Sequence, residues 1–200
     1  MTATDSPKTG LREKKKAKTR AVIQANAMRL FREQGYQATT IEQIADASEV
    51  SPSTMFRYFP TKEALVIEDE FDPMLIELYS RQPPGMSPIQ AFLQTVREGS
   101  ARIPPEARRA VRERMELIYS VPELRAANMS QMSETLNLIA GLIAERTGKD
   151  RGDLSVLALA GAIIGAVLGA HAYCASHPEE DYIDAIQDAL EQMDRTMTSG

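Results

Sequence analysis

The stretch TIEQIADASEVSPSTMFRYFPTK, residues 40–62, predicts two short helices joined by a tight turn. Thr40 can cap the first helix, and Gln43 three residues later completes a capping box. Ser51 followed by Pro52 is typical of a second helix start, because a proline at the first helical position gives up no needed hydrogen bond. Helices this short are not stable alone in water, so both must pack on the rest of the chain.

The second of these helices carries a polar outer face. We expect Met55, Phe56 and Phe59 to point inward as a small core. The residues expected to remain outside are Ser53, Thr54, Arg57 and Tyr58. Hydroxyl, guanidinium and phenol groups bind phosphates and base edges. The stretch therefore predicts a helix-turn-helix whose second helix enters the major groove of DNA.

The order and spacing of about fifteen residues resemble the N-terminal domain of the tetracycline-repressor (TetR) family, over roughly residues 17–77. The matching residues are Ile23, Ala27, Leu30, Phe31, Gly35, Thr40, Ile44, Ala45, Val50, Ser51, Thr54, Phe56, Tyr58, Phe59 and Lys62. The family usually has Ala-Gly before the valine of the turn, whereas this chain has Ser48 and Glu49 there. A residue other than glycine with a positive φ would be strained at that point.

The resemblance implies an all-α protein in two parts, with a three-helix DNA-binding domain over 17–77 and its helix-turn-helix at about 40–59. A helical domain for ligand binding and dimerisation would follow over 78–200. The residues expected to bind DNA are Thr40, Ser51, Ser53, Thr54, Arg57, Tyr58 and Lys62. The implied partners are an operator in double-stranded DNA, a small-molecule effector and a second copy of the chain, with no cofactor.

Charge is distributed unevenly along the chain. Residues 1–62 hold 11 Lys and Arg against 6 Asp and Glu, whereas residues 63–200 hold 12 against 22. A basic head on an acidic body favours nucleic acid as a partner of the head. Residues 1–16 are polar and basic, and we expect them to be disordered. They are either a solubilising tail or an arm that follows the DNA backbone or minor groove.

The remainder of the chain predicts helices separated by prolines. Expected helices open at Pro88, Pro105, Pro122 and Asp153, with a last acidic helix over about 179–197. Three glycines at helical spacing lie in the apolar helix near 154–176: Gly161, Gly165 and Gly169. Such a stripe indicates close packing, either within one chain or between two copies. In the family the last two helices form a four-helix dimer bundle, which favours the dimer.

The body is rich in methionine and aromatic residues, which suit an adaptable apolar pocket. The candidate ligand-binding residues are Phe92, Met115, Tyr119 and Met132. An arginine-rich face near residues 108–114 resembles a subgroup of the family that senses acyl-CoA-like molecules. The alternative is that these residues form an ordinary core and that the arginines are solvated.

Several functions find no support in the sequence. It contains no phosphate-binding glycine loop, no Gly-x-Ser-x-Gly and no His-Glu metal pair, so we expect no enzyme. His171, Cys174 and His177 are poorly spaced for a metal site, and we expect none. The apolar run at 154–173 reaches membrane-spanning length but is rich in Gly and Ala, and we expect no membrane span. A single cysteine and a polar N-terminus fit the cytoplasm.

These observations predict a ligand-responsive transcriptional regulator. We expect a repressor that a small hydrophobic ligand releases from its operator, and the resemblance to the subgroup implies that this ligand is acyl-CoA-like. The alternative is an interaction protein that binds DNA constitutively and responds to no small molecule.

Overall fold

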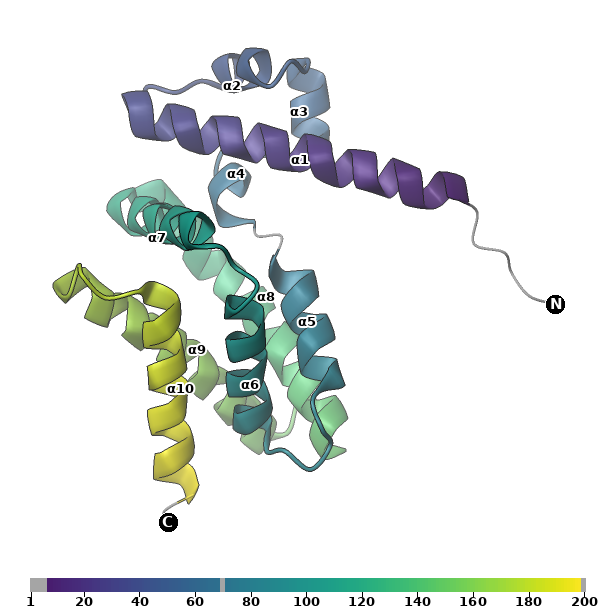
Figure 1. Cartoon of the computed structure of the whole chain (residues 1–200), viewed down its shortest axis with the longest axis vertical. Helices are drawn as coiled ribbons and strands as arrows, with labels where there is room; N and C mark the ends of the chain where they lie inside the picture. Colours follow the sequence, from purple (N-terminus) through teal and green to yellow (C-terminus); the bar gives the residue numbers. More distant parts are fainter. Residues whose placement is uncertain (1–6, 69–70, 199–200) are drawn as a thin grey trace. The chain divides into compact units, whose positions relative to one another are not determined.

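The computed structural model describes residues 7–68 and 71–198, and every regular element in that part of the chain is a helix (Figure 1). The helices are α1 Pro7–Gln34, α2 Ile41–Ala47, α3 Pro52–Tyr58, α4 Ala64–Ile67, α5 Phe71–Arg81, α6 Pro88–Ser100, α7 Pro105–Ser120, α8 Pro122–Thr147, α9 Leu154–Ser176 and α10 Tyr182–Thr198. The all-α prediction is confirmed.

The helices belong to two compact units. The first unit, here called the head, contains α1 to α4 together with residues 121–124 at the start of α8. The second unit, here called the body, contains α5 to α7 and the chain from Arg125 onward. The sequence placed the boundary at residue 77, whereas the contacts of α5 assign it to the body, where it packs on α6.

The head is held together by a small apolar core. Ile23, Ala27 and Phe31 recur on one face of α1 and are buried together with Ile44 of α2 and Met55 of α3. The helix ends where Gly35 takes a φ of 87°, a conformation that glycine reaches without steric cost. This core fixes α2 and α3 against the side of α1 (Figure 1).

The N-terminal arm is partly helical, which corrects the expectation that residues 1–16 are disordered. α1 begins at Pro7, so residues 7–16 continue the helix of the head for more than two turns. Proline is well tolerated at a helix start, and alanine, lysine, arginine and glutamate favour helices. The part of the arm before Pro7 lies outside the described residues.

The body places its core between α6, α8, α9 and α10. Leu93, Ile139, Ile143 and Ile163 are buried together there with Leu190. The predicted starts of α6 to α9 are confirmed, and Ser87 forms a capping box with Gln90 at the start of α6. α10 starts at Tyr182, about three residues later than expected.

Of the described helices, α9 is long and apolar enough to cross a membrane by length and composition. The core helix of a soluble protein can be equally long and apolar.

Candidate nucleic-acid interface and effector pocket

The two helices of the helix-turn-helix start as their sequences predict. Thr40 Oγ1 accepts a hydrogen bond from the Gln43 backbone N–H at 3.3 Å, and Gln43 Oε1 accepts one from the Thr40 N–H at 2.9 Å. Ser51 Oγ accepts a hydrogen bond from the Thr54 N–H at 3.1 Å. These caps fix where α2 and α3 begin, and therefore which residues face outward.

The outer face of α3 includes one residue that the sequence placed inside. Ser53 and Arg57 are exposed as expected, but Phe56 is 49% exposed, which corrects its assignment to the core. In this seven-residue helix the buried side chains are Met55 and the capping Phe59, four residues apart. Phe56 is rotated by about 100° from Met55, so it lies beside Ser53 and Arg57.

The other predicted DNA-binding residues lie around this face. Thr40 and Ser51 are exposed at the caps of α2 and α3, whereas Thr54 and Tyr58 are half-buried. The Arg57 guanidinium lies 5.8 Å from the centre of the Tyr58 ring. The head therefore presents hydroxyls, a guanidinium and two aromatic rings on or beside one short helix, and these are groups that contact base edges or phosphates in DNA-binding proteins.

Arg20 of α1 holds the far end of α3. Its Nη1 donates a hydrogen bond to the Tyr58 carbonyl at 3.0 Å, and its guanidinium lies 4.2 Å from the centre of the Phe59 ring. It also forms an ion pair with Glu68 after α4. A cation at a helix C-terminus satisfies a free carbonyl and interacts favourably with the helix dipole. Arg20 thus orients the recognition helix on α1.

Lys62 is engaged within the head. Its Nζ donates a hydrogen bond to the Tyr36 carbonyl and lies 4.2 Å from the centre of the Tyr36 ring. Partial burial lowers the pKa of Lys62 below its ordinary value, although Glu63 and Glu123 oppose this shift. These contacts give Lys62 a structural role, and they do not favour the phosphate contact expected from the sequence.

The turn between α2 and α3 contains a strained residue. Glu49 has a φ of 54°, in the left-handed region, at the position where the family usually has glycine. For a residue with a Cβ this conformation costs about 1–2 kcal/mol. The departure noted in the sequence is thus accommodated by strain and not by a different turn.

Replacing Glu49 by glycine is expected to stabilise the head by about 1 kcal/mol, because glycine removes the clash at positive φ. Chemical denaturation of the purified protein measures the change. Glu49→Ala is the matched control, since it removes the same carboxylate but keeps the Cβ. Equal stability of the glycine and alanine variants would contradict the assignment of strain to this turn.

The helical arm adds positive charge to the head. Arg12, Lys14, Lys15, Lys16 and Lys18 are exposed on the first part of α1. The helix holds these cations along one rod, which is better ordered than the flexible tail expected from the sequence.

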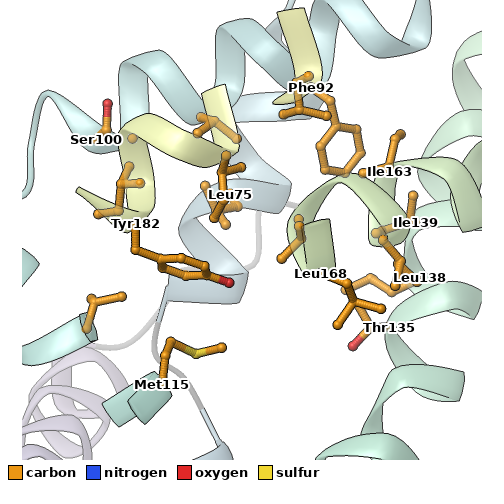
Figure 2. A pocket seen from close by; sticks show the side chains of 18 of the residues that line it. Leu75, Phe92, Ser100, Met115, Thr135, Leu138, Ile139, Ile163, Leu168 and Tyr182 are labelled. Atoms are coloured by element: carbon orange, nitrogen blue, oxygen red, sulfur yellow. The ribbon is translucent and has the colours of Figure 1, made fainter. Parts of the chain in front are cut away.

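The body contains an apolar cavity of about 370 Å³, lined from α5 to α10 (Figure 2). All four candidate ligand-binding residues line it: Phe92, Met115, Tyr119 and Met132. Six of the described lining residues are polar but uncharged: Ser100, Tyr119, Asn128, Gln131, Thr135 and Tyr182. Volume and composition are those of a site for a small apolar molecule.

The arginines of α7 do not line the cavity. Arg108 forms ion pairs with Asp181 and Asp184 of the body, and Arg109 pairs with Glu113 on its own helix. Arg112 pairs with Glu116 in the same way. These groups are engaged with carboxylates, while the other face of α7 supplies Met115 and Tyr119 to the cavity.

A stripe of small residues is exposed along α9. Ala158, Gly161, Gly165 and Gly169 recur every three or four residues and are open to solvent in the protomer. A Cβ added to any of the three glycines would meet no heavy atom within 4 Å in the described chain. These glycines therefore do not serve close packing within the described chain, and contact with another copy stays a prediction.

The three residues weighed as metal ligands make other contacts. The His171 ring is stacked on Tyr119, with ring centres 3.5 Å apart, and His177 is stacked on Tyr173. Burial raises the pKa of the Cys174 thiol. Among the described residues, no group of three or more His, Cys, Asp or Glu side chains could hold a metal ion.

A capped helix pair, an exposed polar recognition helix and a basic arm define the class of helix-turn-helix DNA-binding proteins. Comparison with known proteins gives the family. Residues 23–68 match the bacterial regulatory proteins of the tetR family, and residues 86–198 match the MftR C-terminal domain. The chain belongs to the tetR family of transcriptional regulators.

Individual proteins similar to this chain are also transcriptional regulators or share its fold. The transcriptional regulator TcmR of Streptomyces glaucescens is 34% identical over 164 residues, which cover 75% of this chain and 73% of TcmR. The Thermus thermophilus repressor FadR, solved with lauroyl-CoA, has a TM-score of 0.54 at 24% identity, covering 86% of this chain and 91% of FadR. A SmeT–triclosan complex has a TM-score of 0.56 at 18% identity, with coverages of 87% and 90%. The two structures establish a shared fold.

Proposed function

We propose that this regulator is a homodimeric repressor that a small apolar molecule releases from its operator. The observation that carries the proposal is the cavity of about 370 Å³, because a DNA-binding protein needs no apolar cavity in its body unless something occupies it. Native interiors are close-packed, and apolar atoms that line an unfilled space forgo contacts that a bound molecule would supply.

DNA binding is assigned to the head. The outward residues of α3 would read the major groove, and the cations of the arm would contact the DNA backbone. The proposed dimer forms through α9 and α10, with the glycine stripe at its centre, as expected from the sequence. Two heads related by two-fold symmetry would then read half-sites about 34–36 Å apart. Release follows if the effector favours a state in which the two heads no longer match this spacing.

The chemistry of the effector follows from the lining. FadR is described in complex with lauroyl-CoA and SmeT with triclosan, so proteins of this fold accept both long chains and aromatic rings. An acyl-CoA was the finer expectation from the sequence, based on the arginines of α7. Those arginines are paired with carboxylates and lie outside the cavity lining, so the structure supports the apolar part of that expectation more than the phosphate-binding part.

An effector that occupies the cavity is expected to raise the melting temperature and to release operator DNA over the same concentration range. A ligand at 100 times its Kd stabilises the folded state by about 2.7 kcal/mol. Thermal denaturation and fluorescence anisotropy of a labelled operator, selected from random duplexes, measure the two effects on a panel of apolar compounds.

Val96→Phe is the control for this test. Val96 of α6 lines the cavity, and the larger ring would occupy part of it. The variant should bind operator as tightly as the wild type but respond to no compound of the panel. If no apolar compound stabilises the wild type or releases its DNA, the constitutive alternative is correct.

A further inference from the structure

Three aromatic rings in contact with one another lie at the end of the cavity near α7, α9 and α10. Tyr119 lies on His171 with ring centres 3.5 Å apart, and His171 meets Tyr182 edge-on at 6.2 Å. Tyr119 and Tyr182 line the cavity, whereas His171 stands behind them. We call these three residues the aromatic wall. Because each ring comes from a different helix, the stacking fixes the positions of both phenol groups.

The Tyr182 hydroxyl is directed into the cavity. Only 8% of the residue is exposed, yet its ring reaches toward the centre of the cavity with the oxygen at its tip (Figure 2). This oxygen is not one of the fully buried side-chain atoms of the described chain that lack a hydrogen-bond partner, so it is open to the space of the cavity. Burial raises the pKa of Tyr182 far above its ordinary value, so the phenol keeps its proton at physiological pH. It is therefore a hydrogen-bond donor that a molecule in the cavity can reach.

In the described chain, the lining of the cavity contains no charged side chain that could pair with a charged group of a ligand. None of the described residues that line it is Asp, Glu, Lys, Arg or His. Burial alone raises the pKa of Tyr119 and lowers that of His171, which shows that the wall disfavours the charged form of each group. An ionised ligand group placed among these lining residues would lose its hydration and gain no ion pair from them.

We propose that the effector is an uncharged molecule whose apolar body fills the cavity and whose hydrogen-bond acceptor, such as a carbonyl or ether oxygen, binds the Tyr182 hydroxyl. Tyr182 is then the residue that distinguishes ligands by their polar group, while the apolar lining selects only size and shape. His171 is a positioning residue, because it acts through the two tyrosines that it supports. This inference rests on the proposed effector function of the same cavity.

Two matched pairs of probes test the charge requirement: methyl decanoate with decanoate, and methyl 2-naphthoate with 2-naphthoate. The members of each pair share a body and differ mainly in charge at pH 7. A carboxylic acid can enter a charge-free site by taking up a proton, which at pH 7 disfavours binding by about 300-fold for a pKa near 4.5. We expect the ester of at least one pair to bind at least tenfold more tightly than its acid, with the ratio shrinking as the pH is lowered toward 5.

Tyr182→Phe tests the hydrogen bond, because it removes one oxygen and keeps the ring against His171. The variant should bind the ester about three- to tenfold more weakly than the wild type, as expected for one neutral hydrogen bond. Tyr173→Phe makes the same chemical change on α9 outside the cavity lining and should leave ester binding unchanged. The melting temperature of each variant without ligand shows whether its fold is intact.

The outcomes separate the two proposals. Tighter binding of the carboxylate, or of decanoyl-CoA, than of the matching ester would overturn the uncharged ligand while leaving an apolar effector site in place. Equal ester affinity of the wild type and Tyr182→Phe would overturn the role of Tyr182. If neither ester binds and no compound of the wider panel does, the effector function itself fails.

Discussion

Replacing Gly165 by leucine is expected to convert the proposed dimer into a monomer and, at the same time, to make the isolated protomer more stable. Within the protomer a Cβ at Gly165 meets no heavy atom of the described chain within 4 Å. Leucine favours helix by up to about 1 kcal/mol over glycine, so the protomer alone should gain stability. Across a two-fold interface the same side chain would hold two α9 helices apart, and it would be present twice.

The expected loss of association follows from overpacking. Each inserted side chain costs about 1–3 kcal/mol, so two weaken the dimer by about 2–6 kcal/mol, or at least about thirtyfold. Sedimentation velocity at several protein concentrations measures the dissociation constant, and operator affinity should fall with it because two heads no longer bind together.

Gly10→Leu is the control for this substitution. Gly10 also lies in a helix with open space around it, but on α1 of the head, so its replacement should leave association unchanged. A Gly165→Leu variant that remains a dimer of wild-type affinity would exclude the proposed interface. So would a wild-type protein that is monomeric at micromolar concentration.

Arg57→Ala is expected to weaken operator binding by about 1–3 kcal/mol while changing the affinity for random DNA only slightly. The expectation applies if the exposed guanidinium on α3 donates to a base edge, since base contacts carry specificity. Phe56→Ala probes the neighbouring exposed ring, which could contact a thymine methyl group. Titration of operator and random duplexes by fluorescence anisotropy gives both affinities for each variant.

The cations of the arm are expected to contact phosphates and therefore to strengthen binding to all DNA sequences equally. Exchanging Lys14, Lys15 and Lys16 for alanine preserves helix propensity but removes three exposed charges. Each lost phosphate contact changes the slope of log affinity against log salt by about 0.9, so the slope should flatten by up to about 2–3, equally on both duplexes. An unchanged slope would show that the arm does not contact DNA. Unchanged operator preference after substitution of every outward residue of α3 would mean that α3 does not read bases.

Local chemistry explains why the helix starts could be predicted. Thr40, Ser51 and Ser87 each sit before a helix and bond to backbone N–H groups within three residues. Such caps depend on neighbours in the sequence and not on the tertiary fold. The exposed position of Glu49 at positive φ was visible in the same way, because the turn itself demands it.

The role of a side chain could not be predicted from the sequence where it depends on residues that are distant in the chain but adjacent in the fold. Phe56 is apolar and was assigned to the core, but the head has room for only one face of a two-turn helix. For Lys62 the sequence predicts a phosphate contact, and no local pattern shows the Tyr36 carbonyl that accepts its hydrogen bond. The aromatic wall joins residues from three helices, and no local pattern places Tyr182 beside His171.

Because none of the described lining residues carries a charge, the pocket suits the kind of molecule that also crosses lipid bilayers. The proposed preference for uncharged ligands resembles that of the hydrocarbon interior of a lipid bilayer, because both require a molecule to give up its hydration without compensation. Uncharged apolar compounds of the proposed kind would therefore also be able to cross membranes unaided. A repressor with such a pocket would respond to molecules arriving from outside the cell without any dedicated importer, and its response time would be set by diffusion and dilution.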